Sequence, residues 1–77
     1  MKLGYTIIYV PSVKASLQFF HDAFGLREKF LHEGGDYGEL MTGETTLAFA
    51  AHSLGSANFP AGYVLASDSP LPLGVEI

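Results

Sequence analysis

The sequence predicts an α+β fold, a single βαβββ module in which one helix packs on one face of a mixed sheet. Residues 3–10 have a strand pattern that ends at a proline, and residues 13–24 carry an amphipathic helical stripe. Three further short strand patterns follow before residue 52, separated by turns that contain glycine. Because the helix has one apolar stripe, it must lie on a sheet, and the flanking strands supply that sheet.

The composition limits what the chain can be. Its 77 residues are 48% hydrophobic and 16% charged, with a net charge of −4. A chain this short forms one domain at most, and its apolar excess indicates that some apolar surface is buried against something other than the domain itself. The absence of cysteine excludes disulfide bonds and thiolate zinc sites. The net negative charge provides no excess of basic residues with which to bind the phosphates of a nucleic acid.

The sequence contains no pattern for membrane insertion. Lys2 is followed by a strand pattern and not by the long apolar core of a signal peptide. No apolar run has the length that a bilayer span needs. We therefore expect no membrane association and a cytoplasmic location.

The first strand is predicted over residues 3–10, where β-branched and aromatic residues suit a pleated, buried surface. Pro11 ends it, because proline cannot donate to a ladder. Ile8 and Val10 are expected to meet the helix. Three residues then share the opposite, concave face: Tyr5, Ile7 and Tyr9. A free face of this kind either lines a ligand pocket or packs against another module.

The helix is predicted over residues 13–24. Ser12 fits its N-cap, and Gly25 stands where a left-handed residue would end it. The residues of its apolar stripe follow at spacings of four, three and four: Val13, Leu17, Phe20 and Phe24.

Three further strands are predicted over residues 26–33, 36–41 and 45–51, with turns at residues 34–35 and 42–44. In the last strand Leu47 and Phe49 share one face, and the other face carries Thr46, Ala48 and Ala50. The strands complete a module over residues 3–51.

The remaining third is predicted to be different. Residues 52–74 are rich in proline and glycine and are expected to form a loop or linker, with a short strand over residues 63–66. Residues 75–77 look like the start of a second-module strand whose remainder is absent.

The stretch from Tyr5 to Arg27 resembles the opening of the vicinal oxygen chelate superfamily, which includes glyoxalase I, bleomycin-resistance proteins and extradiol dioxygenases. Residues 16–20, Ser-Leu-Gln-Phe-Phe, stand where that family has Ser-x-x-Phe-Tyr, and Gly25-Leu26 stands at its Gly-Leu/Phe. The resemblance covers residues 3–51, one module. It implies a glyoxalase/bleomycin-resistance fold and a partner, because family members pair two modules into a cupped sheet.

The resemblance also implies where a metal site would lie. Metal-dependent members place ligands on the first and last strands of each module, and the glyoxalase-like histidine and glutamate positions fall here on Tyr5 and Ala48. Tyrosine is a rare ligand for divalent metals and alanine is none. Glu76 falls at the ligand position of a second module. The resemblance therefore implies a metal-free member that uses no cofactor.

We expect binding of a small hydrophobic or cationic molecule, for example sequestration of an antibiotic, in a groove formed by two modules as a homodimer or a two-module protein. The expected lining residues are Tyr5, Ile7, Tyr9, Ala48, Ala50 and Glu76. The alternative is a metal-dependent lyase or dioxygenase whose divalent metal is held by Glu76 and residues beyond position 77. A third hypothesis is an assembly module without a ligand. Whether the chain is an enzyme stays open.

Histidines and clustered carboxylates often form metal or catalytic sites, but in this sequence they are not expected to do so. The three histidines, His21, His32 and His52, have no metal-ligand spacing. Three carboxylates lie close together in sequence around a hairpin: Glu33, Asp36 and Glu39. Because hairpin tips are polar by default, we expect these three to form a solvated turn.

Overall fold

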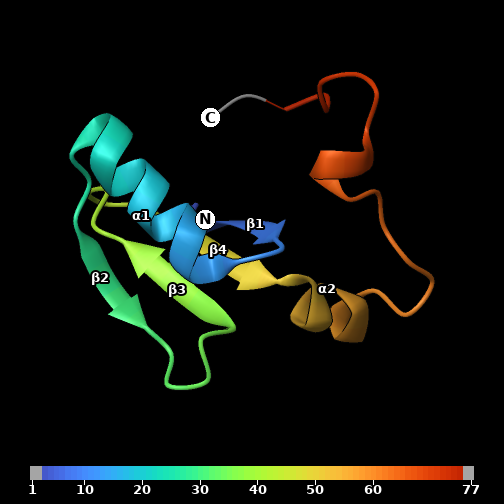
Figure 1. Cartoon of the computed structure of the whole chain (residues 1–77), viewed down its shortest axis with the longest axis horizontal. Coiled ribbons are helices and arrows are strands. Elements are labelled where there is room, and N and C mark those ends of the chain that lie inside the picture. Colours follow the sequence, from blue (N-terminus) through green and yellow to red (C-terminus); the bar gives the residue numbers. More distant parts are fainter. Residues whose placement is uncertain (1–2, 76–77) are drawn as a thin grey trace.

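Four β-strands and two α-helices make up most of the chain in the computed structural model, which describes residues 3–75. Their bounds are β1 (Tyr5–Val10), α1 (Val13–Phe24), β2 (Glu28–Leu31), β3 (Tyr37–Leu40), β4 (Thr46–Ala51) and α2 (His52–Asn58). A 3₁₀ helix, η1 (Ala66–Asp68), follows near the C-terminus. Figure 1 shows α1 against the sheet and the C-terminal segment beyond α2.

The strands form one mixed sheet in the order β1-β4-β3-β2. β1 is parallel to β4, whereas the β4–β3 and β3–β2 pairs are antiparallel. The helix between β1 and β2 packs on one face of this sheet. The predicted α+β class, with βαβββ order, is confirmed.

Both predicted ends of α1 are confirmed. The Ser12 hydroxyl accepts a hydrogen bond from the Ala15 amide at 3.2 Å, as an N-cap does. Gly25 has φ of 70° and donates its amide to the His21 carbonyl at 2.9 Å. A left-handed residue at this point lets the chain leave the helix and enter β2.

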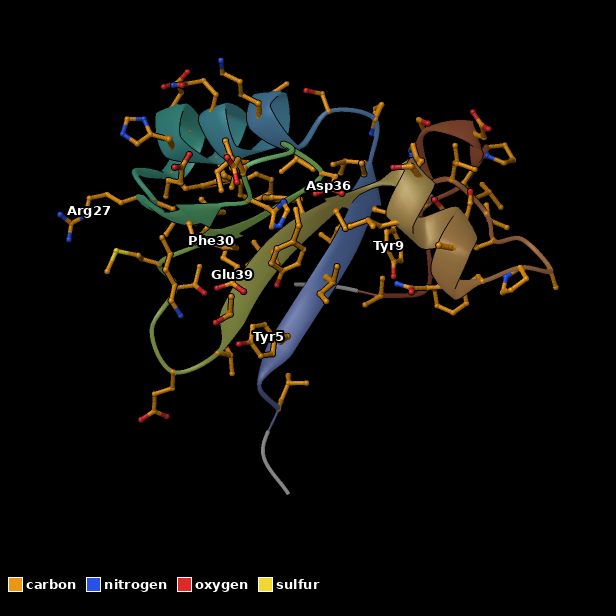
Figure 2. The ribbon with its side chains drawn as sticks, turned by 90° about the horizontal axis from the view of Figure 1, so that it is seen from below. Tyr5, Tyr9, Arg27, Phe30, Asp36 and Glu39 are labelled. Atoms are coloured by element: carbon orange, nitrogen blue, oxygen red, sulfur yellow. The ribbon has the colours of Figure 1, made fainter. Side chains whose placement is uncertain are left out.

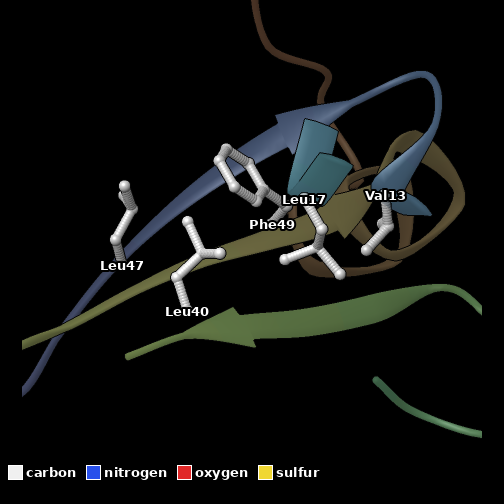
Figure 3. Close-up of a cluster of buried hydrophobic side chains, with 5 residues drawn as sticks. All are labelled: Val13, Leu17, Leu40, Leu47 and Phe49. Atoms are coloured by element: carbon white, nitrogen blue, oxygen red, sulfur yellow. The ribbon is translucent and has the colours of Figure 1, made fainter. Parts of the chain in front are cut away.

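The core lies between α1 and the sheet (Figure 3). Its buried members are Val13, Leu17, Leu40, Leu47 and Phe49. Gly38 allows α1 to approach β3 closely, because a Cβ there would lie 2.8 Å from Leu17 Cδ1. Phe20 packs against this cluster as predicted.

The last residue of the predicted stripe does not join the core. Phe24 is exposed and borders a cavity of about 370 Å³ at the end of the sheet, together with Thr6 and Thr46. The helix ends over this opening, so its last turn has no sheet side chain to bury Phe24 fully.

The strands are shorter than predicted, and the region after β4 is more ordered. β1 begins at Tyr5 and β2 covers only Glu28–Leu31. α2 begins directly after β4, and sequence reasoning did not predict it within residues 52–74. The strand predicted over residues 63–66 is wrong, because Tyr63–Leu65 is irregular and η1 begins at Ala66. Of the predicted second-module strand, residues 76–77 lie outside the described residues.

The two helices are short compared with the roughly 20 residues that a membrane-spanning helix needs. α1 has 12 residues and α2 has 7. Within residues 3–75, no helix combines the length and the apolar character required to cross a bilayer.

Candidate functional site

One face of the sheet is not covered by α1, and its side chains form the candidate site. We call it the free face. The strand register assigns to it alternate residues of each strand, since successive side chains point to opposite faces. Its members are Tyr5, Ile7, Tyr9, Phe30, Tyr37, Glu39, Thr46, Ala48 and Ala50.

Four residues form a continuous row across the middle of the free face. Phe30 of β2 pairs with Glu39 of β3, Glu39 pairs with Ala48 of β4, and Ala48 pairs with Ile7 of β1. Residues paired in this way have neighbouring side chains on the same face. Glu39 therefore stands in the middle of an otherwise apolar row.

Glu39 is held by two neighbours. Its side chain is 12% exposed, and the Tyr37 hydroxyl donates a hydrogen bond to Oε2 at 2.7 Å. Lys29 Nζ lies 3.7 Å from Oε1, and the Lys29 side chain is 51% exposed. The β2–β3 register shifts between Glu28 and Phe30, which is where Lys29 lies. The carboxylate is therefore fixed by a tyrosine and loosely paired with a lysine.

The environment of Tyr37 keeps its phenol protonated. Burial, followed by the hydrogen bond to Glu39, raises the pKa of Tyr37 to about 12. Ionisation would put a second negative charge beside the carboxylate and remove the donated hydrogen bond. Tyr37 thus acts as a neutral donor to Glu39 over the physiological pH range.

Exposed apolar side chains surround Glu39. Tyr5, Ile7 and Phe30 are all exposed, although they lie on a sheet and not on a loop. Figure 2 shows Glu39 with Phe30 and Tyr5 on the side of the sheet away from α1. The Phe30 ring lies 6.2 Å from the Tyr37 ring, centroid to centroid. The site thus offers a carboxylate among accessible rings.

The other end of the free face is closed by the chain itself. Asn58, at the end of α2, donates its side-chain amide to the Tyr9 hydroxyl at 3.1 Å. The rings of Phe59 and Tyr63 lie 5.9 Å and 5.3 Å from the Tyr9 ring. Tyr9, predicted as a lining residue, therefore packs within the chain, and α2 sets the limit of the accessible surface.

Two other predicted lining residues lie on the free face but are not accessible. Ala48 and Ala50 are 0% and 3% exposed. They belong to β4, between β1 and β3, so the larger side chains of those strands shield them. Of the predicted lining residues, Tyr5 and Ile7 are exposed, Tyr9 is partly buried, and Glu76 lies outside the described residues.

Tyr37 and Glu39 are the site residues that sequence reasoning missed. Composition around the hairpin predicts a solvated turn for Glu39, but this residue lies within β3 and is mostly buried. The signal was present in the alternation of this strand: Gly38 and Leu40 face α1, so Tyr37 and Glu39 must face the opposite side. Asp36, by contrast, does lie at the hairpin and pairs with His32 at 3.4 Å.

The residues of the free face do not fit a divalent-metal site. Among residues 3–75, no three histidine, cysteine or carboxylate side chains come close enough to hold a metal ion together. Tyr5 and Ala48, the two positions that the sequence resemblance implies for metal ligands, supply neither a carboxylate nor an imidazole. The oxygens of Glu39 already face Tyr37 and Lys29.

A second concavity lies along β1. It has a volume of about 550 Å³ and is lined on one side by Thr6, Ile7, Ile8 and Tyr9 of β1 and on the other by the C-terminal segment. That segment contributes Tyr63, Val64, Ala66, Leu71, Pro72, Leu73 and Val75. Because β1 is an edge strand of the sheet that residues 3–75 form, its outer edge faces this space.

Comparison with known protein families gives a match over most of the chain. The model of the Glyoxalase/Bleomycin resistance protein/Dioxygenase superfamily matches residues 2–64, which include every strand of the sheet and both α-helices. No curated protein matches the chain.

Proposed function

The chain belongs to the Glyoxalase/Bleomycin resistance protein/Dioxygenase superfamily, and we propose that it binds a small molecule on its free face without a metal. The observation that carries this proposal is the exposure of Tyr5, Ile7 and Phe30 around Glu39. Exposed apolar side chains on one face of a small domain mark an interaction surface. A charged group among them supplies orientation and selectivity.

Binding, and not turnover, is the activity that these residues support best. A general base or nucleophile needs a free reactive atom near the substrate. On the free face the Tyr37 hydroxyl is bonded to Glu39, and its high pKa keeps it protonated. A protein that binds without turnover sequesters its ligand, and an antibiotic is one molecule that such a protein would remove from solution.

We propose further that two modules close the site. A single open sheet face surrounds a ligand on one side only, whereas small-molecule sites usually bury most of the ligand surface. β1 lies at the edge of the described sheet, where it pairs with β4. A second copy, or a second module of a longer chain, that took the place of the C-terminal segment at this edge would continue the sheet and extend the free face around the ligand.

Thermal unfolding with a panel of small aromatic, aliphatic and cationic molecules tests the proposal. A ligand at 100 times its Kd stabilises the folded state by about 2.7 kcal/mol and raises Tm measurably. We expect at least one hit, and we expect its effect to be lost in the double variant Tyr5→Ala/Ile7→Ala. Phe19→Ala is the matched control, because Phe19 is an exposed aromatic residue on α1 and not on the free face.

Two results would overturn the proposal. The first is a panel without any hit, or hits that the double variant retains in full. The second is a natively purified protein that contains one tightly bound transition metal per site and needs this metal for binding. That second result would favour a metal-dependent lyase or dioxygenase, with Glu76 as the first residue to mutate.

A further inference from the structure

The ion pair on the free face is asymmetric. Glu39 is 12% exposed and is anchored through Oε2 by Tyr37, whereas Lys29 is 51% exposed. The 3.7 Å between Lys29 Nζ and Glu39 Oε1 exceeds the roughly 2.7–2.9 Å of a charge-assisted hydrogen bond. An exposed, flexible ammonium at this distance contributes little to stability. The carboxylate is therefore the more firmly held charge of the pair, and the lysine side chain is already half exposed to water.

The surroundings of Glu39 favour a cation over an anion. Phe30 pairs with Glu39 in the sheet, and the Tyr37 and Tyr5 rings belong to the same face. Aromatic faces attract cations through their quadrupole, and the attraction strengthens when the cation is partly desolvated. An anionic ligand would instead lose its hydration beside a carboxylate that cannot turn away. The overall charge of −4 acts in the same direction.

We propose that the free face selects organic cations with an apolar or aromatic body, and that the cationic group of the ligand replaces the Lys29 ammonium beside Glu39. Lys29 is then a built-in counter-ion that keeps the carboxylate neutralised while the site is empty. The apolar body of the ligand lies against Phe30, Tyr5 and Ile7. This inference rests on the proposed function, since it names the ligand class of the same site.

Three probes with one ring system test the inference: trimethyl(2-naphthylmethyl)ammonium, the neutral 2-naphthalenemethanol and the anionic 2-naphthylacetate. Their Kd values are measured by naphthyl fluorescence at pH 7. We expect the Kd of the cation to be at least about tenfold lower than that of the alcohol. The attraction between a partly desolvated cation and aromatic rings is large enough to give a tenfold difference in Kd. The anion is expected to bind most weakly.

Two variants separate the roles of the paired charges. Glu39→Gln keeps the shape of the side chain, and we expect it to lose most of the cation preference, because only the attraction of the aromatic rings remains. Lys29→Met removes the competing ammonium from an exposed position, and we expect it to bind the cation several-fold more tightly than the unmodified protein does. Because Lys29 is half exposed, this second variant is expected to fold even if Glu39→Gln does not.

The outcomes distinguish this inference from the proposed function. If the alcohol binds as tightly as the cation, or if Lys29→Met weakens cation binding, the cation preference is overturned and small-molecule binding stands. A cation preference that Glu39→Gln retains in full also overturns the inference. If no probe binds the unmodified protein, the inference is overturned. The thermal-unfolding panel of small molecules then tests the proposed function separately.

Discussion

The Tyr37 hydroxyl lies 2.7 Å from Glu39 Oε2 and donates a hydrogen bond to it, on the face of the sheet that α1 leaves uncovered. Both residues belong to β3 and are two positions apart, so their side chains point the same way. The pair puts a protonated phenol beside a fixed carboxylate. It is the polar centre of the candidate site.

Alkaline titration should detect this pair. The pKa of Tyr37 in the folded protein is raised to about 12 from an ordinary value of 10.0. Between these two pH values the native chain keeps the proton that the unfolded chain has lost. The free energy of unfolding therefore falls as pH rises through this window, and the contribution of Tyr37 is complete below pH 10.

Absorbance at 295 nm checks this prediction. We expect one phenol to titrate near pH 12 while the protein remains folded, and we expect Tyr37→Phe to remove that phase. Glu39→Gln should move the phase to lower pH, since it removes the adjacent negative charge. If the Tyr37→Phe variant still shows the phase near pH 12, the assignment of that phase to Tyr37 is wrong.

Replacing Gly38 with alanine should loosen the packing of α1. The new Cβ would lie 2.8 Å from Leu17 Cδ1 and 3.1 Å from Val13 Cγ1, and both of these side chains are buried in the core. Overpacking of this kind costs about 1–3 kcal/mol. Urea unfolding measures the change. Gly4→Ala is the control, because a Cβ at Gly4 would have no neighbour within 4 Å, and an equal loss in both variants would refute the packing argument.

Gly55→Ala should release the C-terminal segment without unfolding the sheet. Gly55 is buried in α2, and a Cβ there would lie 2.7 Å from Tyr63 Cζ. Tyr63 would have to move, and its hydroxyl would lose the 2.7 Å hydrogen bond to His52 Nδ1. Alanine itself favours the helix by up to about 1 kcal/mol, so the global stability should change little.

Hydrogen exchange and limited proteolysis measure this release. We expect faster amide exchange and faster cleavage in residues 59–68 of the Gly55→Ala variant, with unchanged exchange in β3 and β4. Ser56→Ala, an exposed substitution in the same helix, should behave like the unmodified protein. Equal protection of residues 59–68 in both variants would show that Tyr63 does not anchor the segment.

Ser12→Ala should destabilise the fold by about 1 kcal/mol, because it leaves the Ala15 amide without its side-chain acceptor. Thermal unfolding measures the loss. Ser12→Asp should restore most of it, since a carboxylate also caps this position and interacts favourably with the helix N-terminus. A failure of the aspartate to rescue would mean that Ser12 acts through another contact.

Much of the fold was predictable because its determinants are local. The N-cap at Ser12, the left-handed Gly25 and the stripe through Val13 and Leu17 depend on residues within one or two helical turns. α2 was not predictable in the same way. Its seven residues have no side-chain cap, and a helix this short is stable only when it packs against other elements.

The site was predictable only in part. Alternation along β1 correctly assigned Tyr5 and Ile7 to the free face, and the structure leaves both exposed. It could not show that Asn58, which is 49 positions away in the sequence, would bind the Tyr9 hydroxyl. Nor could composition around the hairpin distinguish Glu39, inside a strand, from the solvated carboxylate of Asp36 at the turn.

Local sequence patterns establish the order of the main elements and the face on which each of their side chains lies, because caps, turns and the periodicities of helix and strand are set by near neighbours. Which strands are adjacent depends instead on tertiary packing. The order β1-β4-β3-β2 brings Phe30, Glu39, Ala48 and Ile7 into one row and places β1 at the edge of the sheet. Strand pairing joins residues far apart in the chain, and its energy comes from the burial of the whole sheet against α1, which no local pattern contains.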